Sequence, residues 1–589
     1  MSRAHRNADQ RASDLTWAWV VTALAGAALA WTALPEAHWH DTGEFGAVAR
    51  RLSLAHPPGH PAHTQLTHGI MQLPFAGGGF RANLGSVLPL AGAMGWFSLI
   101  LRHISPSAPR WLTAVVALVP LSLPTLWLQG VRAEVYALQL LLTVIMVERV
   151  AAAHLRSSMD SRVVVELSML LGIAGANHTL LALCMLPLAL WAVVPAVKRH
   201  PRVILPAEIA GILSLGLYAH LVIRARAGGV VGWGAPDTLD RFWRVISGHA
   251  WRTSSLTEIE SPEPLDQVFH LFSWWLDQVG PIGGGVILLC IAGAALMLLR
   301  DRGRWWVIGG AMAVSLPVLY TKFTYAFDRL NPDIGGYLAP AVLAGWAVAW
   351  LACDTLSSAT RRVSWAVLPA LAVIWLPQVD THHHMGARSA TLLARARLEP
   401  LPPDSIIAYS DYSAWFLDGW ARAIEGRRPD VAPLFRGRMH TPWSRERVAA
   451  AYPEVAPLVE DFPQRAVEAG WFVAIESGVK IDEMSIPPAA WGITLSAGGP
   501  PVSLEAMVKA HAVLGAPPAD LDGRRMWALS HGQSALAELP WIARGAPQAR
   551  ARARWHLKQA LKIAPKDQWL LELAAGIEDR NGLDEDRRR

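Results

Sequence analysis

The chain has 589 residues, of which 52% are hydrophobic and only 17% charged, and its mean hydropathy is +0.26. Soluble proteins carry about 25% charged residues, so this chain has too little charge to cover a soluble surface. The net charge of +6 is modest, and we expect no nucleic-acid partner. The three cysteines lie in or beside apolar runs, which argues against a disulfide framework and a zinc finger: Cys184, Cys290 and Cys353.

Apolar runs, each long enough to cross a bilayer, recur as far as residue 378. The first run, 15–34, is too long for the apolar core of a cleavable signal, so we expect a retained helix. Two adjacent runs abut at Asn177 and His178 and are the hardest to separate. By hydropathy the chain has about eleven spans, at 15–34, 84–101, 111–128, 134–151, 163–179, 180–196, 203–223, 280–299, 305–321, 335–353 and 363–378.

Basic residues gather in alternate loops between these runs. Lys and Arg mark the cytoplasmic side, so the tail 1–14 is predicted to be cytoplasmic. An odd number of spans then places the chain after residue 379 on the periplasmic or extracytoplasmic side of the cell (inner) membrane. The outer loops 35–83, 224–279 and 322–334 are long or chemically dense, and we expect the chemistry there, within a transmembrane domain at 15–379.

The C-terminal part has more proline and charge and shorter apolar stretches. SIIAYS at 405–410 and WFVAIES at 471–477 are typical of buried strands between helices. We predict a soluble α/β-type lobe at 380–500 and a helical segment at 501–589. Within the latter, 553–580 resembles one tetratricopeptide-like helix–turn–helix. One such unit cannot bury its own face, so it should pack on the lobe or on a protein partner.

The first outer loop carries two acids, Asp41 and Glu44, just beyond the first span. If 41–52 is a helix, a spacing of three puts both carboxylates on one face. A carboxylate at this place can act as a general base toward an attacking hydroxyl. The alternative is structural, because an acid followed three residues later by Glu is typical of a capping box. The two interpretations are compatible.

The same loop continues with HPPGHP, formed by His56, Pro57, Pro58, Gly59, His60 and Pro61. Two prolines exclude a helix interior and glycine permits a sharp turn, so a rigid elbow is predicted. Imidazoles and carboxylates bind divalent ions, and a divalent metal is the one cofactor that the sequence leaves open. The alternative is that these histidines bond to neighbours or to phosphate. The set is His38, His40, His56, His60, His63 and His68.

Other polar residues stand at the predicted outer ends of spans. An acid there is costly unless paired, and Arg132 is the natural partner of Glu134. Arginine suits bidentate phosphate binding, which makes Arg224 a candidate; snorkelling to the interface is the structural alternative. The remaining candidates are Arg226, Asn177, His178, Asp328, Asp333 and Tyr337.

Several motifs, in this order, resemble the membrane family known as domain of unknown function 2723. They are HDTGEF, LAHPPGHP, FRANLGS, AEVYALQ, GANHTLL, GLYAHLVIRA, VGWGAPDTL and PDIGGYLAP, followed by YSDYSAWFLDGWARAIEGRRPDV. The resemblance covers most of residues 15–435. One departure concerns the W-G-D-P pattern of the family, where Ala235 replaces the acid and puts the role of that loop in doubt.

The resemblance implies a GT-C-type architecture that uses a polyprenyl-phosphate sugar, and a eukaryotic relative of the family is a protein O-mannosyltransferase. It implies that Asp41 is the catalytic base, Glu44 its helper, HPPG a shaping element and Arg224 a ligand of the donor phosphate.

The sequence thus predicts an inverting GT-C-type hexosyltransferase. It would move a sugar, with mannose as the leading choice, from a polyprenyl-phosphate donor to a hydroxyl of an exported protein, lipid or glycan. Two other classes stay open: a transporter or flippase for a lipid-linked substrate, and a membrane-anchored assembly protein that docks through its C-terminal helices.

Overall fold

The computed structural model describes residues 3–155, 160–227, 233–249, 333–355, 390–439, 441–476, 488–491, 493–497, 503–512 and 521–586, and isolated residues at 269–288 and 361–373. The chain forms two compact units. The first comprises 1–35, 55–223 and 236–381, and the second comprises 36–54, 224–235 and 382–589. The short segments 36–54 and 224–235, predicted to belong to outer loops, therefore belong to the unit that holds the C-terminal part.

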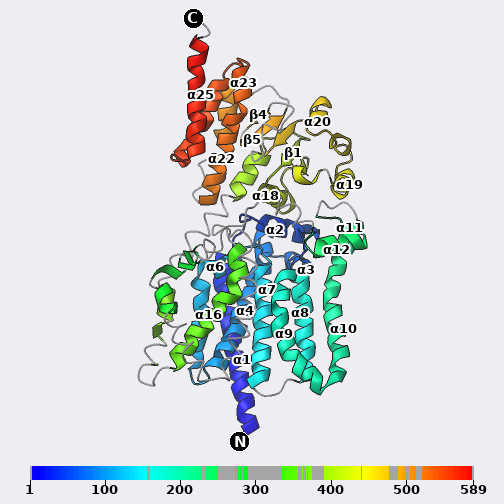
Figure 1. Cartoon of the computed structure of the whole chain (residues 1–589), viewed down its shortest axis with the longest axis vertical. Helices are drawn as coiled ribbons and strands as arrows, with labels where there is room; N and C mark the ends of the chain where they lie inside the picture. The colour runs from blue at the N-terminus through cyan, green and yellow to red at the C-terminus, as the bar shows by residue number, and fades with distance from the viewer. Residues whose placement is uncertain are drawn as a thin grey trace. The chain divides into compact units, whose positions relative to one another are not determined.

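The first unit is built from long apolar helices, which run side by side in Figure 1. Its long helices are α1 (Arg3–Thr32), α4 (Gly78–Ile104), α7 (Tyr136–Leu155), α8 (Ser161–Asn177), α9 (Thr179–Arg199), α10 (Ile204–Leu215) and α16 (Asp333–Thr355). Shorter ones are α3 (Pro61–Met71), α5 (Arg110–Leu118), η1 (Val119–Ser122), α6 (Pro124–Val131), η2 (Pro201–Val203), η3 (Gly216–Tyr218) and α12 (Leu239–Ile246). Helix α11 (Ala219–Ala227) begins in this unit and ends in the second.

Among the described residues, six helical segments are long and apolar enough to cross a membrane: Asp9–Thr32, Gly78–Ile104, Tyr136–His154, Thr179–Arg199, Pro201–Ala227 and Asp333–Asp354. A bent pair raises the number to as many as seven. These helices support a multi-pass membrane protein. The predicted run 305–321 lies outside the described residues, and 280–299 and 363–378 lie mostly outside, so the number eleven stays a prediction.

The run predicted as one span at 111–128 is bent. Arg110–Ser122 and Pro124–Val131 form helical segments that meet at 84°. A proline lacks the amide hydrogen and clashes with the preceding turn, so Pro124 begins a new helix rather than extending the old one. The abutting runs at Asn177 are two helices, because His178 is extended (φ −152°, ψ 99°) and separates α8 from α9.

Burial separates central from peripheral helices within this unit. In α4 and α7, 83% of the most apolar window is buried, against 22% in α1 and 17% in Pro201–Ala227. α4 packs against both α1 and α7. The peripheral helices expose large apolar side chains such as Trp31 and Leu213. A helix that is apolar on its exposed side suits a lipid surround.

The second unit contains a five-stranded mixed sheet of order β2-β1-β3-β5-β4. The strands are β1 (Ile406–Tyr409), β2 (Ala432–Phe435), β3 (Val473–Ile475), β4 (Pro488–Trp491) and β5 (Thr494–Ala497). β1 is parallel to β2 and β3, whereas β5 is antiparallel to β3 and β4. β1 and β3 lie in the two stretches where the sequence predicts strands, and their residues are buried as predicted.

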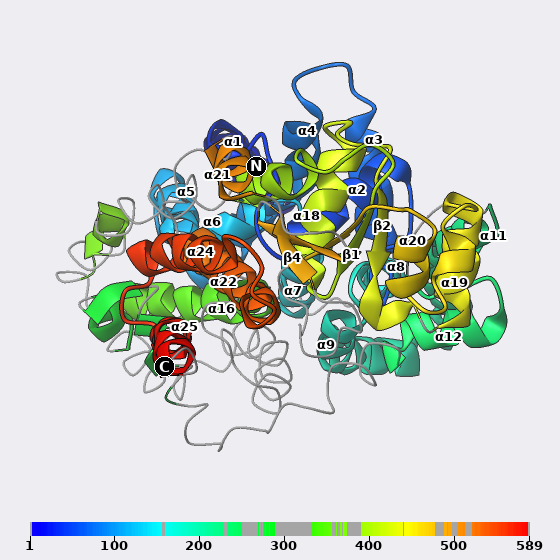
Figure 2. The same cartoon turned by 90° about the horizontal axis from the view of Figure 1, so that it is seen from above.

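The other elements of this unit are helical. They are α2 (Thr42–Arg51), α18 (Tyr412–Ala423), η4 (Arg436–Arg438), α19 (Pro442–Ala451), η5 (Ala456–Leu458), α20 (Gln464–Glu468), α21 (Leu504–Ala512), α22 (Leu521–Ala537), α23 (Leu539–Ala543), α24 (Ala549–Ile563) and α25 (Gln568–Asp586). α24 and α25 form the helix–turn–helix predicted at 553–580. They pack on α22 (Figure 2). Helix α22 in turn contacts β4 and β5.

Helix α2 is held in the second unit by close packing on α18. Gly43 and Gly46 lie on the side of α2 that faces α18. A Cβ on Gly43 would lie 2.7 Å from the backbone of Phe416, and one on Gly46 would lie 2.1 Å from the ring of Trp420. The two glycines therefore allow a backbone approach that a larger residue would prevent.

This close approach predicts that Gly46→Ala lowers the free energy of unfolding of the purified protein by about 1–3 kcal/mol, the usual cost of overpacking. Gly576→Ala is the matched control, because Gly576 on α25 has open space around it, and it should cost nothing or stabilise slightly. Thermal unfolding followed by tryptophan fluorescence compares the two, and equal shifts would contradict the packing described.

Candidate active site

The two predicted catalytic acids lie at the start of α2. Asp41 is the N-cap residue, yet its side chain makes no capping hydrogen bond. Glu44, in the first turn, is buried. The predicted helix is confirmed, whereas the capping interpretation of the Asp41 side chain is not what the structure shows.

A cavity of about 80 Å³ lies beside Glu44 within the second unit. Its walls combine two arginines with aromatic rings from the segment around Trp233 and from α18. The Arg422 guanidinium donates to the Tyr452 hydroxyl at 3.0 Å. The main lining residues are Glu44, Arg51, Trp233, Trp415, Arg422 and Tyr452. Cations beside aromatic faces can bind an anionic or polar ligand in such a cavity.

Arg224 lies at the other end of α2. Its Nη2 donates to the carbonyl of Arg51, the last residue of α2, at 3.4 Å. A cation at a helix C-terminus interacts favourably with the unpaired carbonyls, so Arg224 has a structural task there. Its predicted contact with a donor phosphate stays a prediction.

The segment 224–235 is anchored by aromatic packing. The Trp233 ring stacks on Tyr412 at 5.1 Å between centroids, and the Arg438 guanidinium lies 4.5 Å above the same ring. Arg447 also donates to the backbone carbonyl of Ala225. Ala235, which replaces the acid of the W-G-D-P family pattern, therefore lies in a segment that packs within the second unit.

The predicted elbow is present in the first unit. A backbone hydrogen bond from Gly59 N to His56 O, 2.7 Å long, closes a turn, and the Pro57–Pro58 peptide is cis. Gly59 has φ +97°, and a Cβ there would lie 2.7 Å from Leu221. Only glycine combines this backbone angle with this close approach. Pro61 then opens α3.

The elbow buries His60. Its Nδ1 lies 2.6 Å from the Asn177 carbonyl, to which it must donate, so Nε2 carries the lone pair. Burial, and then the neighbouring His56 and His178, lower the pKa of His60 well below its ordinary value. The ring is therefore neutral near pH 7, and a neutral imidazole can accept a proton or a hydrogen bond.

Three predicted residues, Asn177, His178 and Tyr337, come together around His60, and Tyr136, which the sequence analysis did not single out, joins them. The His60 and His178 ring centroids are 5.4 Å apart, and His178 Nε2 lies 3.3 Å from the Tyr337 hydroxyl. The Asn177 side-chain amide donates to the Val135 carbonyl and to Gln139, both at 3.0 Å. Tyr136 packs against Tyr337 at 5.0 Å between centroids.

Arg132 pairs with two carboxylates. Its Nη2 lies 2.6 Å from Asp333 Oδ1, and its Nη1 lies 3.3 Å from Glu134 Oε1. Arg132 and Glu134 are fully buried. The predicted Arg132–Glu134 pair is thus confirmed. Asp333 is 201 residues away from Arg132, and nothing in the sequence around Arg132 predicts their ion pair.

The remaining loop histidines bond to near neighbours. Along α3, His63 Nε2 lies 3.3 Å from Thr67 Oγ1, and His68 Nε2 lies 3.2 Å from the Gln72 amide. Burial lowers the pKa of His63 to about 4. His38, which is buried, and His40 precede α2 in the second unit. The contacts along α3 fit the alternative of plain hydrogen bonding, and a metal at the loop histidines stays a prediction.

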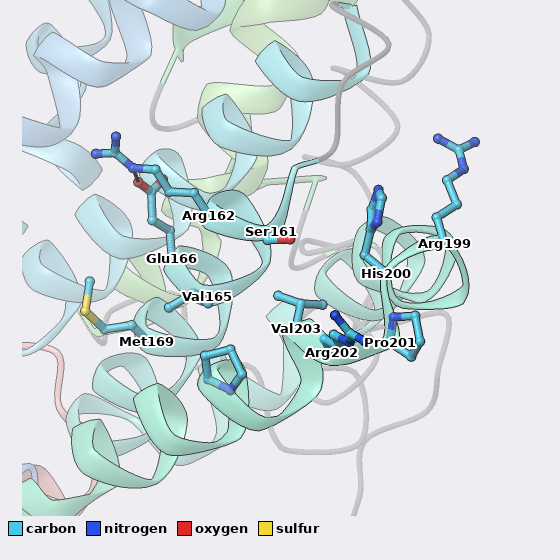
Figure 3. Close-up of a pocket in the computed structure, with 11 residues that line it drawn as sticks. Ser161, Arg162, Val165, Glu166, Met169, Arg199, His200, Pro201, Arg202 and Val203 are labelled. Atoms are coloured by element: carbon cyan, nitrogen blue, oxygen red, sulfur yellow. Dashed lines mark hydrogen bonds and ion pairs between the residues drawn. The ribbon is translucent and has the colours of Figure 1, made fainter.

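A larger concavity of about 840 Å³ lies at the ends of α8 and α9, between Ser161 and Pro206. Four basic side chains line it, but they do not converge. Arg162 is paired with Glu166 at 2.9 Å, and Figure 3 shows Arg162 and Arg199 pointing to opposite sides. This pocket lies in a predicted cytoplasmic loop and contains none of the predicted site residues. We therefore do not assign the chemistry to it.

Comparison with known proteins gives two findings. A family model described as the N-terminal domain of protein O-mannosyl-transferase TMEM260 matches residues 41–201. The mouse (Mus musculus) protein O-mannosyl-transferase TMEM260 is 24% identical over an alignment of 455 positions, which covers 70% of this chain. The chain spans 62% of the length of that relative. The match starts at Asp41 and includes Glu44, the elbow, Glu134, Asn177 and His178.

Among solved structures, ArnT from Cupriavidus metallidurans bound to undecaprenyl phosphate has a similar fold. The TM-score is 0.52 at 13% identity, and the likeness covers 82% of this chain and 98% of ArnT. The chain thus shares the fold of this GT-C structure, which is the architecture that the resemblance implied. The chain is similar in sequence to an O-mannosyltransferase and in fold to a membrane enzyme of the GT-C class.

The buried ion pairs predict that Arg132→Gln lowers the free energy of unfolding by about 3–5 kcal/mol, because two buried carboxylates lose their cation. Arg162→Gln is the control, since its partner Glu166 is on the same exposed helix face, and it should cost at most about 0.5 kcal/mol. Thermal unfolding in detergent measures both. Similar losses would show that the buried pairs do not stabilise the unit.

Proposed function

We propose that this protein is a membrane glycosyltransferase that moves a sugar, most simply mannose, from a polyprenyl-phosphate donor to a hydroxyl of an exported protein, lipid or glycan. The observation that carries the proposal is the family match that begins at Asp41. The matched stretch contains the acid pair, the elbow and the buried residues His60, Asn177 and His178, and the family model describes the N-terminal domain of a protein O-mannosyl-transferase. The GT-C fold supports it independently.

The donor class is inferred from fold and chemistry together. The ArnT structure of similar fold was solved with undecaprenyl phosphate. A lipid phosphate needs apolar surface for its chain and cations for its head group. The exposed apolar helix faces supply the first, and arginines such as Arg224 are proposed for the second.

In the proposed reaction the Asp41 carboxylate takes the proton from the acceptor hydroxyl while that oxygen attacks the anomeric carbon. The bond between this carbon and the phosphate oxygen breaks, and polyprenyl phosphate leaves with the electron pair. A single displacement inverts the anomeric configuration. Arg224 neutralises the leaving phosphate, and Glu44 supports Asp41 from one turn further along α2.

We assign a binding role to the residues around His60 in the first unit. The His178–Tyr337 contact and the neutral His60 ring offer both donors and acceptors for sugar hydroxyl groups. The Arg132 pairs fix Asp333 at the start of α16, and thereby Tyr337 one turn later. Glu134, Asn177 and the HPPG elbow act by positioning these groups.

We also propose how the chain is oriented in the membrane. With the N-terminus in the cytoplasm, the acid pair and the C-terminal part lie on the outer side, where an exported acceptor is present. Membrane lipid surrounds the spans, and the C-terminal helices offer a surface to a protein partner. The proposal assigns the leaving-group charge to arginine. If a divalent metal at the loop histidines carried this role instead, a chelator would abolish transfer.

The reaction predicts that Asp41→Asn lowers the transfer rate by about 10²–10⁴, the usual contribution of a general base. The assay incubates purified protein with labelled polyprenyl-phosphate mannose and an extract of the cell envelope, and counts labelled acceptor. Glu454→Gln, an exposed acid of the second unit, is the control and should keep full activity.

Normal turnover by Asp41→Asn would remove Asp41 from the mechanism. If wild type forms no product but moves lipid-linked sugar across vesicle membranes, the protein is a flippase. If deletion of 520–589 abolishes function while Asp41→Asn does not, the assembly role is correct.

A further inference from the structure

Three histidines that the proposed reaction does not use come together in the second unit. His511 is on α21, His531 on α22 and His556 on α24. One ring nitrogen of each lies within 4.8 Å of one from each of the others. The ring centroids are 4.7 Å apart for His511 and His531, 5.3 Å for His531 and His556, and 5.5 Å for His511 and His556.

The three rings are almost inaccessible to solvent. Their exposed fractions are 7% for His511, 1% for His531 and 0% for His556. Polar groups buried to this extent normally have hydrogen-bond partners, because leaving one unsatisfied destabilises the folded state. Three imidazoles inside a helical bundle therefore destabilise the folded state unless their ring nitrogens have partners.

The three rings supply only some of the required hydrogen bonds to one another. His531 Nδ1 lies 3.0 Å from His556 Nδ1, so one of these nitrogens donates to the other. Within the described residues, the Nε2 atoms of both rings are buried without a hydrogen-bond partner. The nearby acid Glu538 is already bound by Arg552 through two hydrogen bonds, at 2.9 and 2.7 Å.

Two of the three rings, His531 and His556, are also kept neutral. Burial and then His511 lower the pKa of His531 well below its ordinary value. Burial and then His531 and His511 do the same for His556, with Arg552 adding to the effect. Neutral imidazole with a free lone pair is the form that binds transition metals.

Aromatic packing is the competing explanation. Trp555 lies 4.8 Å from His511 and 5.2 Å from His556 between centroids, and Trp527 lies 5.4 Å from His531. Apolar side chains would fill the same space without burying ring nitrogens, so packing alone gives no reason for histidine at all three positions.

We propose that His511, His531 and His556 bind one divalent transition-metal ion, with zinc as the best fit, and that this ion ties α21 to α22 and α24. Three imidazoles are a ligand set that suits zinc, with a water or another small ligand in the fourth position. Zinc–nitrogen bonds of about 2.0–2.1 Å in a tetrahedron place the nitrogens about 3.3 Å apart. Metal binding would draw the nitrogens together to that spacing from separations of up to 4.8 Å.

The site is independent of the proposed transfer reaction, because it shares no residue with it. Its role is to hold α21, which joins the bundle near the Trp527 and Trp555 rings. A metal that binds only the folded form stabilises that form in proportion to its binding.

The test uses the full-length protein in detergent, purified through a tag without histidine and stripped with a chelator. We expect wild type to take up one zinc per chain and to melt at a higher temperature with zinc. His511→Gln and His556→Gln should each weaken zinc binding at least tenfold. His200→Gln, an exposed histidine of the first unit, is the control and should bind as wild type does.

Cobalt gives a second readout that does not depend on stability. Cobalt bound by wild type should show the intense visible absorption of a tetrahedral site, and added copper should quench the tryptophan fluorescence of wild type but not of His511→Gln. The proposal is overturned if stripped, folded wild type takes up no zinc, or if the folded variants bind it equally well. If a variant fails to fold, the metal content and cobalt spectrum of wild type decide.

Discussion

Arg132 is a fully buried cation, and the architecture of the first unit depends on how its charge is balanced. It follows the last turn of α6, its partner Glu134 precedes α7, and its other partner Asp333 begins α16. A buried guanidinium is tolerated only with ionised and well-placed partners. The two ion pairs of Arg132 therefore fix the ends of three helices. They also fix the positions of the Glu134, Tyr136 and Tyr337 side chains.

A second constraint is steric and involves glycine rather than charge. Gly59 lets the elbow turn against Leu221, and this turn carries His60 to the Asn177 carbonyl. In the other unit, Gly43 and Gly46 let α2 approach α18, and this places Glu44 at a cavity lined by arginine and aromatic rings. In both cases, a position without a side chain sets where a polar side chain lies.

The histidines show that one residue type serves different purposes in this chain. His60 is neutral and oriented by a backbone carbonyl, and His63 and His68 bond along their own helix. His511, His531 and His556 are buried and, from three separate helices, each brings one ring nitrogen within 4.8 Å of the others. The first group suits hydrogen bonding to a polar ligand and the second suits a metal, although only the first group stands out in the sequence as a dense run.

The sequence by itself determined what depends on local pattern. Apolar runs located the helices of the first unit, short apolar stretches located β1 and β3, and the prolines and glycine of HPPG located the elbow. The motif order pointed to the GT-C fold and to the acids at 41 and 44. Each of these is a property of a few neighbouring residues, set by hydrophobic length, backbone angles or side-chain chemistry.

Only the tertiary structure decided which distant residues meet. Nothing near Arg132 in sequence indicates Asp333, because a buried charge is balanced in space rather than along the chain. The three metal-site histidines lie on separate helices and are single residues in ordinary helical segments, so no spacing rule connects them. The assignment of 36–54 and 224–235 to the unit with the C-terminal sheet likewise depends on packing, through Gly46 on Trp420 and Trp233 on Tyr412. Such contacts arise from shape complementarity, which a linear pattern does not contain.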